Sequence, residues 1–92
     1  MNLTDKQLLQ VEDMAAALLP ADEIAILINL TAPERNTFIE IVKTHTSSPV
    51  YLAFHRGRLT TKYELRKTII KLAKHGSPAA EPIAEKYIRE QL

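Results

Sequence analysis

The side chains of this chain that are most able to do chemistry lie in the run HRGRLTTKYELRKTIIKLAKHG, residues 55–76. This run holds seven Lys or Arg residues and one acidic residue, Glu64. Cations spaced along one element neutralise phosphates, and each neutralised phosphate adds salt-dependent affinity for a nucleic acid. The same pattern is also typical of the solvated face of a long helix, so both interpretations stay open at this point.

The rest of the chain is acidic on balance. The net charge is +1 over 92 residues, but residues 1–54 carry three basic and seven acidic side chains. Residues 76–92 carry two basic and three acidic ones. Segregated charge of this kind indicates either a polyanionic partner or contact between unlike parts of neighbouring copies.

The composition is that of one ordinary globular domain, 46% hydrophobic and 25% charged, with two glycines and no cysteine. Disulfides and thiolate metal sites are therefore excluded. The three histidines, at positions 45, 55 and 75, lack metal-ligand spacing and are expected in loops or at helix ends. No phosphate-binding loop or dinucleotide fingerprint occurs. We expect a protein that is not an enzyme, with no catalytic residues, metal or cofactor.

The sequence gives no sign of a membrane segment. Its first ten residues, MNLTDKQLLQ, are polar where a signal peptide is basic and then apolar. No apolar stretch approaches the roughly 20 residues that span a bilayer. We expect a cytoplasmic protein without a membrane partner.

The spacing of apolar residues predicts an all-α fold of about five helices in a single domain, residues 1–92, with no alternating pattern typical of a strand. Thr4 and Gln7 form a capping box that opens a first helix over residues 5–19. Apolar residues at helical spacing continue to Leu18, and Pro20 is expected to end this helix.

Residues 20–44 are typical of a helix-turn-helix unit, in which a short helix supports a second one that enters the DNA major groove. The short helix is expected to stop near Asn29, and a second capping box at Thr31 opens a helix to about Lys43. The outward face of that helix is predicted to present Pro33, Asn36, Thr37 and Glu40, flanked by Arg35 and Lys43. Asn36 suits an adenine edge, and the two cations suit phosphates. Helical hairpins of this kind also occur in proteins that never bind DNA, and Glu34 and Glu40 balance the two cations.

The pattern of residues 49–92 predicts a basic helical hairpin, which is also expected to serve in oligomerisation. A long helix starts at Pro49 and is expected to continue through Gly57, although Thr61 and Glu64 match a capping box and leave a break at residues 57–60 as the alternative. Gly76 ends this helix. A last helix starts near Pro82, with its apolar residues Ile83, Tyr87 and Ile88 expected to pack inward.

The long helix carries two apolar groups, Leu59, Tyr63, Ile70 and Ala73, and Leu65, Ile69 and Leu72. They leave a narrower polar stripe of Glu64, Lys67, Lys71 and Lys74, bordered by Arg58, Lys62 and Arg66. An apolar face this wide is more than so short a chain can cover. We therefore expect a homo-oligomer.

Residues 51–80, YLAFHRGRLTTKYELRKTIIKLAKHGSPAA, carry a family resemblance. This segment resembles the stretch after the helix-turn-helix in small phage DNA-binding proteins of the terminase small-subunit type. The resemblance rests on Tyr51, Gly57, a K-x-E-L-R-K run from Lys62 to Lys67 and a G-S-x-x-A turn from Gly76 to Ala80. The resemblance implies a protein of a phage, prophage or mobile element that binds double-stranded DNA. It also implies an oligomer, often a ring, and a packaging-motor protein as a further partner.

Two functions from different classes follow. The first is double-stranded DNA binding by Arg35, Asn36, Thr37, Lys43, Arg58, Lys62, Arg66, Lys67, Lys71 and Lys74. The alternative is an oligomeric interaction or scaffold module, in which the basic helix of one copy meets the acidic surface of a neighbouring copy.

Overall fold

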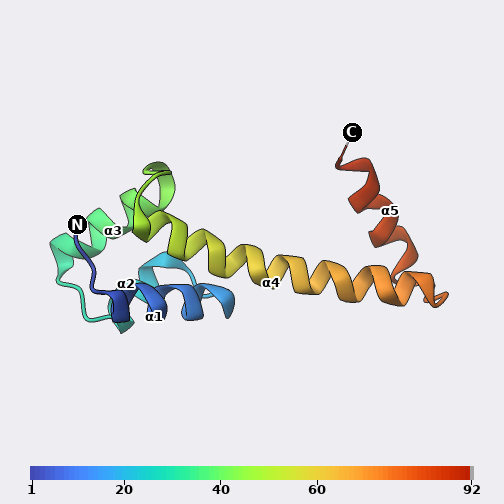
Figure 1. The fold of residues 1–92 in the computed structure, drawn as a ribbon, viewed down its shortest axis with the longest axis horizontal. Coiled ribbons are helices and arrows are strands. Elements are labelled where there is room, and N and C mark those ends of the chain that lie inside the picture. The colour runs from blue at the N-terminus through green and yellow to red at the C-terminus, as the bar shows by residue number, and fades with distance from the viewer. Residues whose placement is uncertain (92) are drawn as a thin grey trace. The chain divides into compact units, whose positions relative to one another are not determined.

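The computed structural model describes residues 1–91 and contains helices α1 (Asp5–Ala16), α2 (Ala21–Leu27), α3 (Ala32–Thr44), α4 (Pro49–Lys74) and α5 (Glu81–Arg89), with no strand in that range (Figure 1). The predicted all-α fold of five helices is confirmed. The chain divides into two compact units, the N-terminal unit Met1–Thr61 and the C-terminal unit that begins at Lys62. Over residues 1–91, no helix has both the length and the apolarity needed to cross a membrane.

The two predicted capping boxes are present. Thr4 accepts a hydrogen bond from the Gln7 backbone N–H at 3.1 Å, and the Gln7 side chain accepts from the Thr4 N–H at 2.9 Å. Thr31 and Glu34 repeat this exchange at the start of α3. Each box satisfies two backbone donors that have no partner within the helix, and so fixes where the helix begins.

Three helices end in the same way, with one residue in the left-handed region. That residue is Leu18 after α1 (φ 66°), Asn29 after α2 (φ 64°) and Gly76 after α4 (φ 86°). The stops at Asn29 and Gly76 agree with the sequence. The predicted end of the first helix at residue 19 is wrong, because α1 ends at Ala16. The chain reverses at Leu18, and the backbone N–H of Leu19 donates to the Met14 carbonyl at 3.2 Å. The first helix therefore ends before it reaches Pro20, so Pro20 is not the residue that ends it.

The core of the N-terminal unit is formed where α1, α2 and α3 pack around the first part of α4 (Figure 1). Phe38 of α3 and Ile24 of α2 are fully buried in it, and Phe54 of α4 is nearly so. Burial of each such side chain contributes about 1.5–3 kcal/mol to folding. This packing holds α3 with one face inward and the opposite face free.

Gly57 lies inside α4 without breaking it, so the continuous helix is confirmed and the alternative break at residues 57–60 is not observed. The reason for a glycine here is the close approach of α1. A β-carbon on Gly57 would overlap the backbone oxygen of Glu12 and stand 3.0 Å from both the Ala15 β-carbon and the Ala16 nitrogen. The residue that weakens the helix is the one that lets α1 pack against it.

Side chains of α4 complete the C-terminal end of α1. The Thr61 hydroxyl donates to the Ala16 carbonyl, and the Arg58 Nη2 donates to the Leu19 carbonyl at 3.1 Å. Carbonyls at a helix C-terminus have no partner within the helix, so these two contacts stabilise the turn after α1. Thr61 thus acts across the helix pair and does not cap a new helix.

The C-terminal unit contains much less buried surface. Within residues 62–91, only Ala80 and Ala84 are buried. The predicted inward packing of α5 is wrong for Ile83 and Ile88, which are 40% and 62% exposed, and it holds in part for the half-buried Tyr87. The buried residue of α5 is the small Ala84, and Ala80, directly before the helix, is buried as well.

Candidate nucleic-acid interface

The outward face of α3 has the arrangement expected of a reading helix. Four residues, Ile28–Thr31, connect α2 to α3, a length typical of a helix-turn-helix. Pro33, Asn36, Thr37 and Glu40 are all exposed, as predicted, while Phe38 and Val42 anchor the opposite face. Thr37 also donates to the Pro33 carbonyl at 3.2 Å, which leaves its oxygen as an acceptor. Asn36, beside it, is exposed, and its side chain makes no hydrogen bond within residues 1–91.

The two flanking cations of α3 differ in their surroundings. Arg35 is half-buried, and its Nη1 donates to the Leu30 carbonyl at 3.2 Å, so this guanidinium helps to close the turn between α2 and α3. Lys43 is exposed in the last turn of α3. Of the two residues predicted to reach phosphates, Lys43 is the one with a solvated charge.

The first residue of the chain lies beside the outward face of α3. Met1 lines a hollow of about 490 Å³ together with Asn36, Thr37 and Glu40. Nothing in the spacing of the sequence indicates this proximity, because Met1 precedes α1 and Asn36 belongs to α3. Met1 and Asn36 nevertheless line the same hollow.

Arg58 does not belong with the solvated cations. Besides its bond to Leu19, its guanidinium carbon lies 4.7 Å from the centre of the Phe54 ring. Its Nε is buried and has no hydrogen-bond partner within residues 1–91. This side chain is held inside the N-terminal unit, so its charge is turned away from a surface partner.

Arg66 is likewise engaged, in the C-terminal unit. Its Nη2 lies 2.7 Å from Glu90 Oε2, and its guanidinium lies 4.1 Å from the centre of the Tyr87 ring. The hydrogen bond from Arg66 lowers the pKa of Glu90, and the positive charges of Lys86 and Lys62 act in the same direction. Arg66 joins α4 to α5, and Lys62 is exposed one turn before it.

Three of the predicted lysines remain on one face of α4. Lys67, Lys71 and Lys74, here called the lysine row, follow at spacings of four and three residues. All three are exposed, and no carboxylate within residues 1–91 forms an ion pair with any of them. At 1.5 Å per residue the row extends over about 10 Å.

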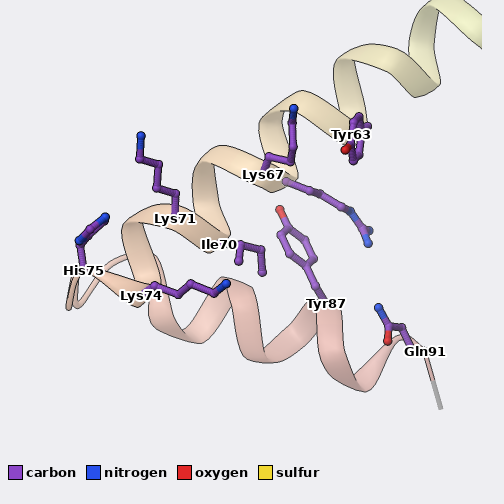
Figure 2. Close-up of a pocket in the computed structure, with 9 residues that line it drawn as sticks. Tyr63, Lys67, Ile70, Lys71, Lys74, His75, Tyr87 and Gln91 are labelled. Carbon is purple, nitrogen blue, oxygen red and sulfur yellow. The ribbon is translucent and has the colours of Figure 1, made fainter.

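The lysine row borders a groove of about 590 Å³ between α4 and α5 (Figure 2). Ile70 and Tyr87 point toward one another between the two helices, while Lys67 and Lys71 point away from α5. Tyr63 is 62% exposed, with the Lys67 Nζ 4.7 Å from its ring centre. The groove thus combines an apolar floor with a cationic rim.

The histidines occupy three kinds of place. His45 caps the end of α3 and His75 follows the end of α4, as expected. His55 is different, since it lies inside α4 and its Nε2 donates to the Val42 carbonyl at 2.9 Å. Over residues 1–91, no three His, Asp or Glu side chains gather as a metal site would require.

The predicted DNA-binding residues therefore form two separate groups. The N-terminal unit holds Arg35, Asn36, Thr37 and Lys43 on α3 and Arg58 on the first part of α4. The C-terminal unit holds Lys62, Arg66 and the lysine row. Comparison of the chain with family models, with curated proteins and with solved structures finds no match in any of the three.

Proposed function

We propose that this chain is a non-enzymatic protein that binds double-stranded DNA. The observation that carries the proposal is the lysine row, three exposed cations on one helix face without an ion-pair partner in the described residues. Lysines left without carboxylates on one face form a polycationic strip that attracts a polyanion. Each lysine that neutralises a phosphate releases a counterion and adds affinity.

The turn between α2 and α3 supports the double-stranded form as the target. Asn36 and Thr37 are exposed on a helix that an anchored partner helix holds outward, the geometry that major-groove readers use. Glu34 and Glu40 on the same helix disfavour close phosphate contact, so we assign α3 to base edges and the lysine row to phosphates. Arg58 and Arg66 are left out of the proposed contact set, because their guanidinium groups are engaged inside their own units.

The wider setting is proposed from the resemblance to terminase small subunits. In that setting the chain acts in the cytoplasm, as a DNA-binding component of a phage, prophage or mobile element, with a packaging-motor protein as a further partner. The apolar side chains left exposed on the C-terminal unit, among them Leu65 and Leu72, support self-association.

The test is a titration of the full chain into a fluorescent random-sequence duplex at low salt. Lys71→Gln with Lys74→Gln should weaken binding about tenfold or more. Lys6→Gln with Lys86→Gln removes the same charge from exposed positions outside the proposed contact set and serves as the matched control. If the two double variants lose the same affinity for the duplex, the effect comes from net charge alone, which would contradict a defined phosphate site.

Asn36→Ala separates the two roles. It should leave the affinity for a random duplex within about twofold, because base contacts add little to non-specific binding. It should lower the affinity for a selected binding sequence by about 1–3 kcal/mol, the usual contribution of one good base contact.

A further inference from the structure

The apolar floor of the groove between α4 and α5 is not explained by phosphate binding. Ile70 and Tyr87 form this floor, and Tyr63 at its edge is 62% exposed. Phosphates would contact the lysines at the rim and leave the apolar atoms in water. A partner that covers the floor must be apolar in its middle and acidic at its edge.

The C-terminal unit buries little apolar surface of its own. Its described part, residues 62–91, buries only Ala80 and Ala84 and has no disulfide. Units below about 40 residues usually need a disulfide, a metal or an association with another chain. Burial of the groove against another surface would supply the missing apolar contacts.

The chain itself presents a surface of the required chemistry, the outward face of α2. Ile24, Ala25 and Ile28 point into the core, so the opposite side of this short helix carries Asp22, Glu23, Ile26 and Leu27, here called the acidic face. Ile26 and Leu27 are 58% and 55% exposed. No hydrogen bond or ion pair within residues 1–91 involves the side chains of Asp22 or Glu23.

We propose that the groove between α4 and α5 receives the acidic face of α2 from a second copy of this chain. Ile26 and Leu27 cover Ile70 and Tyr87, and the two carboxylates pair with the lysine row. The dimensions agree, since Asp22 to Leu27 extends over about 8 Å of helix and the lysine row over about 10 Å. The charges agree as well, because the N-terminal unit carries seven acidic and five basic side chains, whereas residues 62–92 carry seven basic and four acidic ones.

Two consequences follow from the use of unlike surfaces. When two copies associate, one copy still has a free groove and the other still has a free acidic face. Further copies can therefore add at both ends, and association continues into a ring or an open chain. The proposal also rests in part on the proposed function, because the lysines that pair with the acidic face are those assigned to DNA phosphates. DNA and the second copy therefore compete for the groove.

The first experiment measures the mass of the full chain by sedimentation over a wide concentration range at low salt. Wild type should form species larger than a dimer as its concentration rises. Asp22→Asn with Glu23→Gln should raise the dissociation constant about tenfold, the loss expected for two ion pairs of about 0.7 kcal/mol each. Asp5→Asn with Glu81→Gln, which removes exposed carboxylates from the first turns of two other helices, should leave it unchanged. A wild type that stays monomeric would overturn the proposal.

The second experiment uses charge reversal and mixing. Asp22→Lys with Glu23→Lys destroys the acidic face, and Lys71→Glu with Lys74→Glu destroys the lysine row. Neither variant should associate alone, but a mixture should, because the unaltered groove of the first accepts the unaltered acidic face of the second. Mixtures that remain monomeric while both variants keep their helical circular dichroism would contradict the contact.

Failure of this proposal can be told apart from failure of DNA binding. If both proposals hold, the neutral variant Asp22→Asn with Glu23→Gln associates about tenfold more weakly but keeps its affinity for DNA, and added duplex dissociates the wild-type assembly. If only DNA binding holds, that variant associates as wild type does. If only association holds, wild type assembles but binds no duplex at low salt.

Discussion

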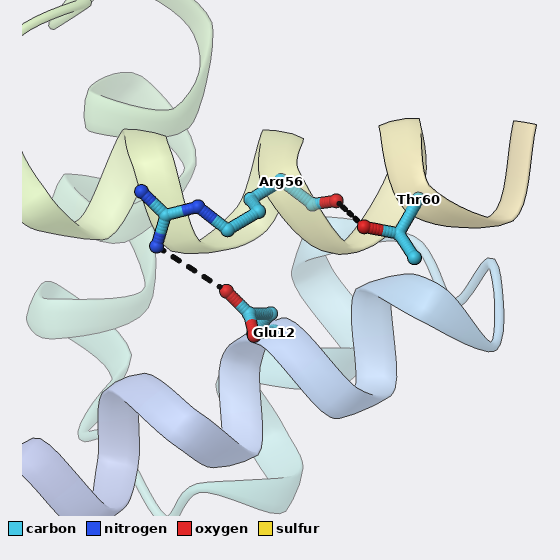
Figure 3. Close-up of polar contacts among 3 residues, drawn as sticks. All are labelled: Glu12, Arg56 and Thr60. Carbon is cyan, nitrogen blue, oxygen red and sulfur yellow. Dashed lines mark hydrogen bonds and ion pairs between the residues drawn. The ribbon is translucent and has the colours of Figure 1, made fainter. Parts of the chain in front are cut away.

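The backbone carbonyl of Glu12 on α1 occupies the space where a β-carbon on Gly57 of α4 would stand. Two helices meet here without an intervening side chain, and on either side of the meeting point they are joined by polar contacts. Arg56 lies 3.4 Å from Glu12 across the same pair of helices (Figure 3). That ion pair is well exposed and contributes little, so the contact depends on the missing β-carbon.

Gly57→Ala should therefore destabilise the N-terminal unit, although alanine favours a helix more than glycine does. The added methyl group must push α1 away, a loss of about 1–3 kcal/mol of the kind seen for overpacked cores. Thr60→Ala is the matched control, because Thr60 is exposed in the same helix and donates only to the Arg56 carbonyl in its own helix (Figure 3). Urea unfolding followed by circular dichroism measures both variants, and a stabilised Gly57→Ala protein would contradict the close packing.

Leu18→Gly should have the opposite sign. Leu18 adopts φ 66° with its side chain exposed, and a non-glycine residue in that region costs about 1–2 kcal/mol. Glycine also has greater conformational entropy in the unfolded chain, which offsets part of this gain. We therefore expect the free energy of unfolding to rise by about 0.5–1 kcal/mol. Thermal unfolding should show a higher midpoint. A lower midpoint would mean that the Leu18 side chain makes a stabilising contact.

The capping box of α3 predicts a dependence of stability on pH. The Thr31 backbone N–H and hydroxyl lower the pKa of Glu34 below its usual value of 4.5. A carboxyl whose pKa is lowered by folding stabilises the fold above its unfolded pKa, and this contribution is lost as the pH falls through the folded pKa. Glu34→Gln keeps an acceptor for Thr31 but cannot titrate. Its midpoint of thermal unfolding should change less than that of wild type between pH 7 and acid pH, and identical profiles would count against the pKa shift.

Arg58 should matter for stability and not for DNA. Arg58→Met keeps much of the side-chain volume but removes the donor to Leu19 and the cation beside Phe54. We expect a loss of about 1–3 kcal/mol, because the Leu19 carbonyl loses its partner. The salt dependence of duplex binding by the folded variant should equal that of wild type. A reduced dependence would return Arg58 to the phosphate-contacting residues.

Much of the fold could be predicted from local signals in the sequence. The capping boxes at Thr4 and Thr31 and the left-handed stops at Asn29 and Gly76 depend on residues within one or two turns, so their chemistry can be read from the sequence alone. The end of α1 could not be read in this way. Leucine has no preference for a left-handed backbone, and the turn at Leu18 is supported by Arg58 and Thr61, about 40 residues further along the chain.

The candidate site was less predictable for the same reason. The sequence located the cations but could not show that Arg58 and Arg66 are engaged by Leu19, Phe54, Tyr87 and Glu90. Ile83 and Ile88, which were expected to pack inward, are exposed, whereas the small residues Ala80 and Ala84 are buried. The spacing of apolar residues alone does not distinguish these two sets. Pairings between distant elements decide which charges stay in solvent, and no local pattern records them.

The measurement that tests DNA binding most directly is the affinity of wild type for a random-sequence duplex at several salt concentrations between about 50 and 200 mM. Three lysines on phosphates predict a slope of about −2.7 for the logarithm of affinity against the logarithm of salt, and Lys71→Gln with Lys74→Gln should reduce it to about −0.9. No binding at the lowest salt, or a slope that those two substitutions leave unchanged, would contradict the assignment of the lysine row to DNA phosphates.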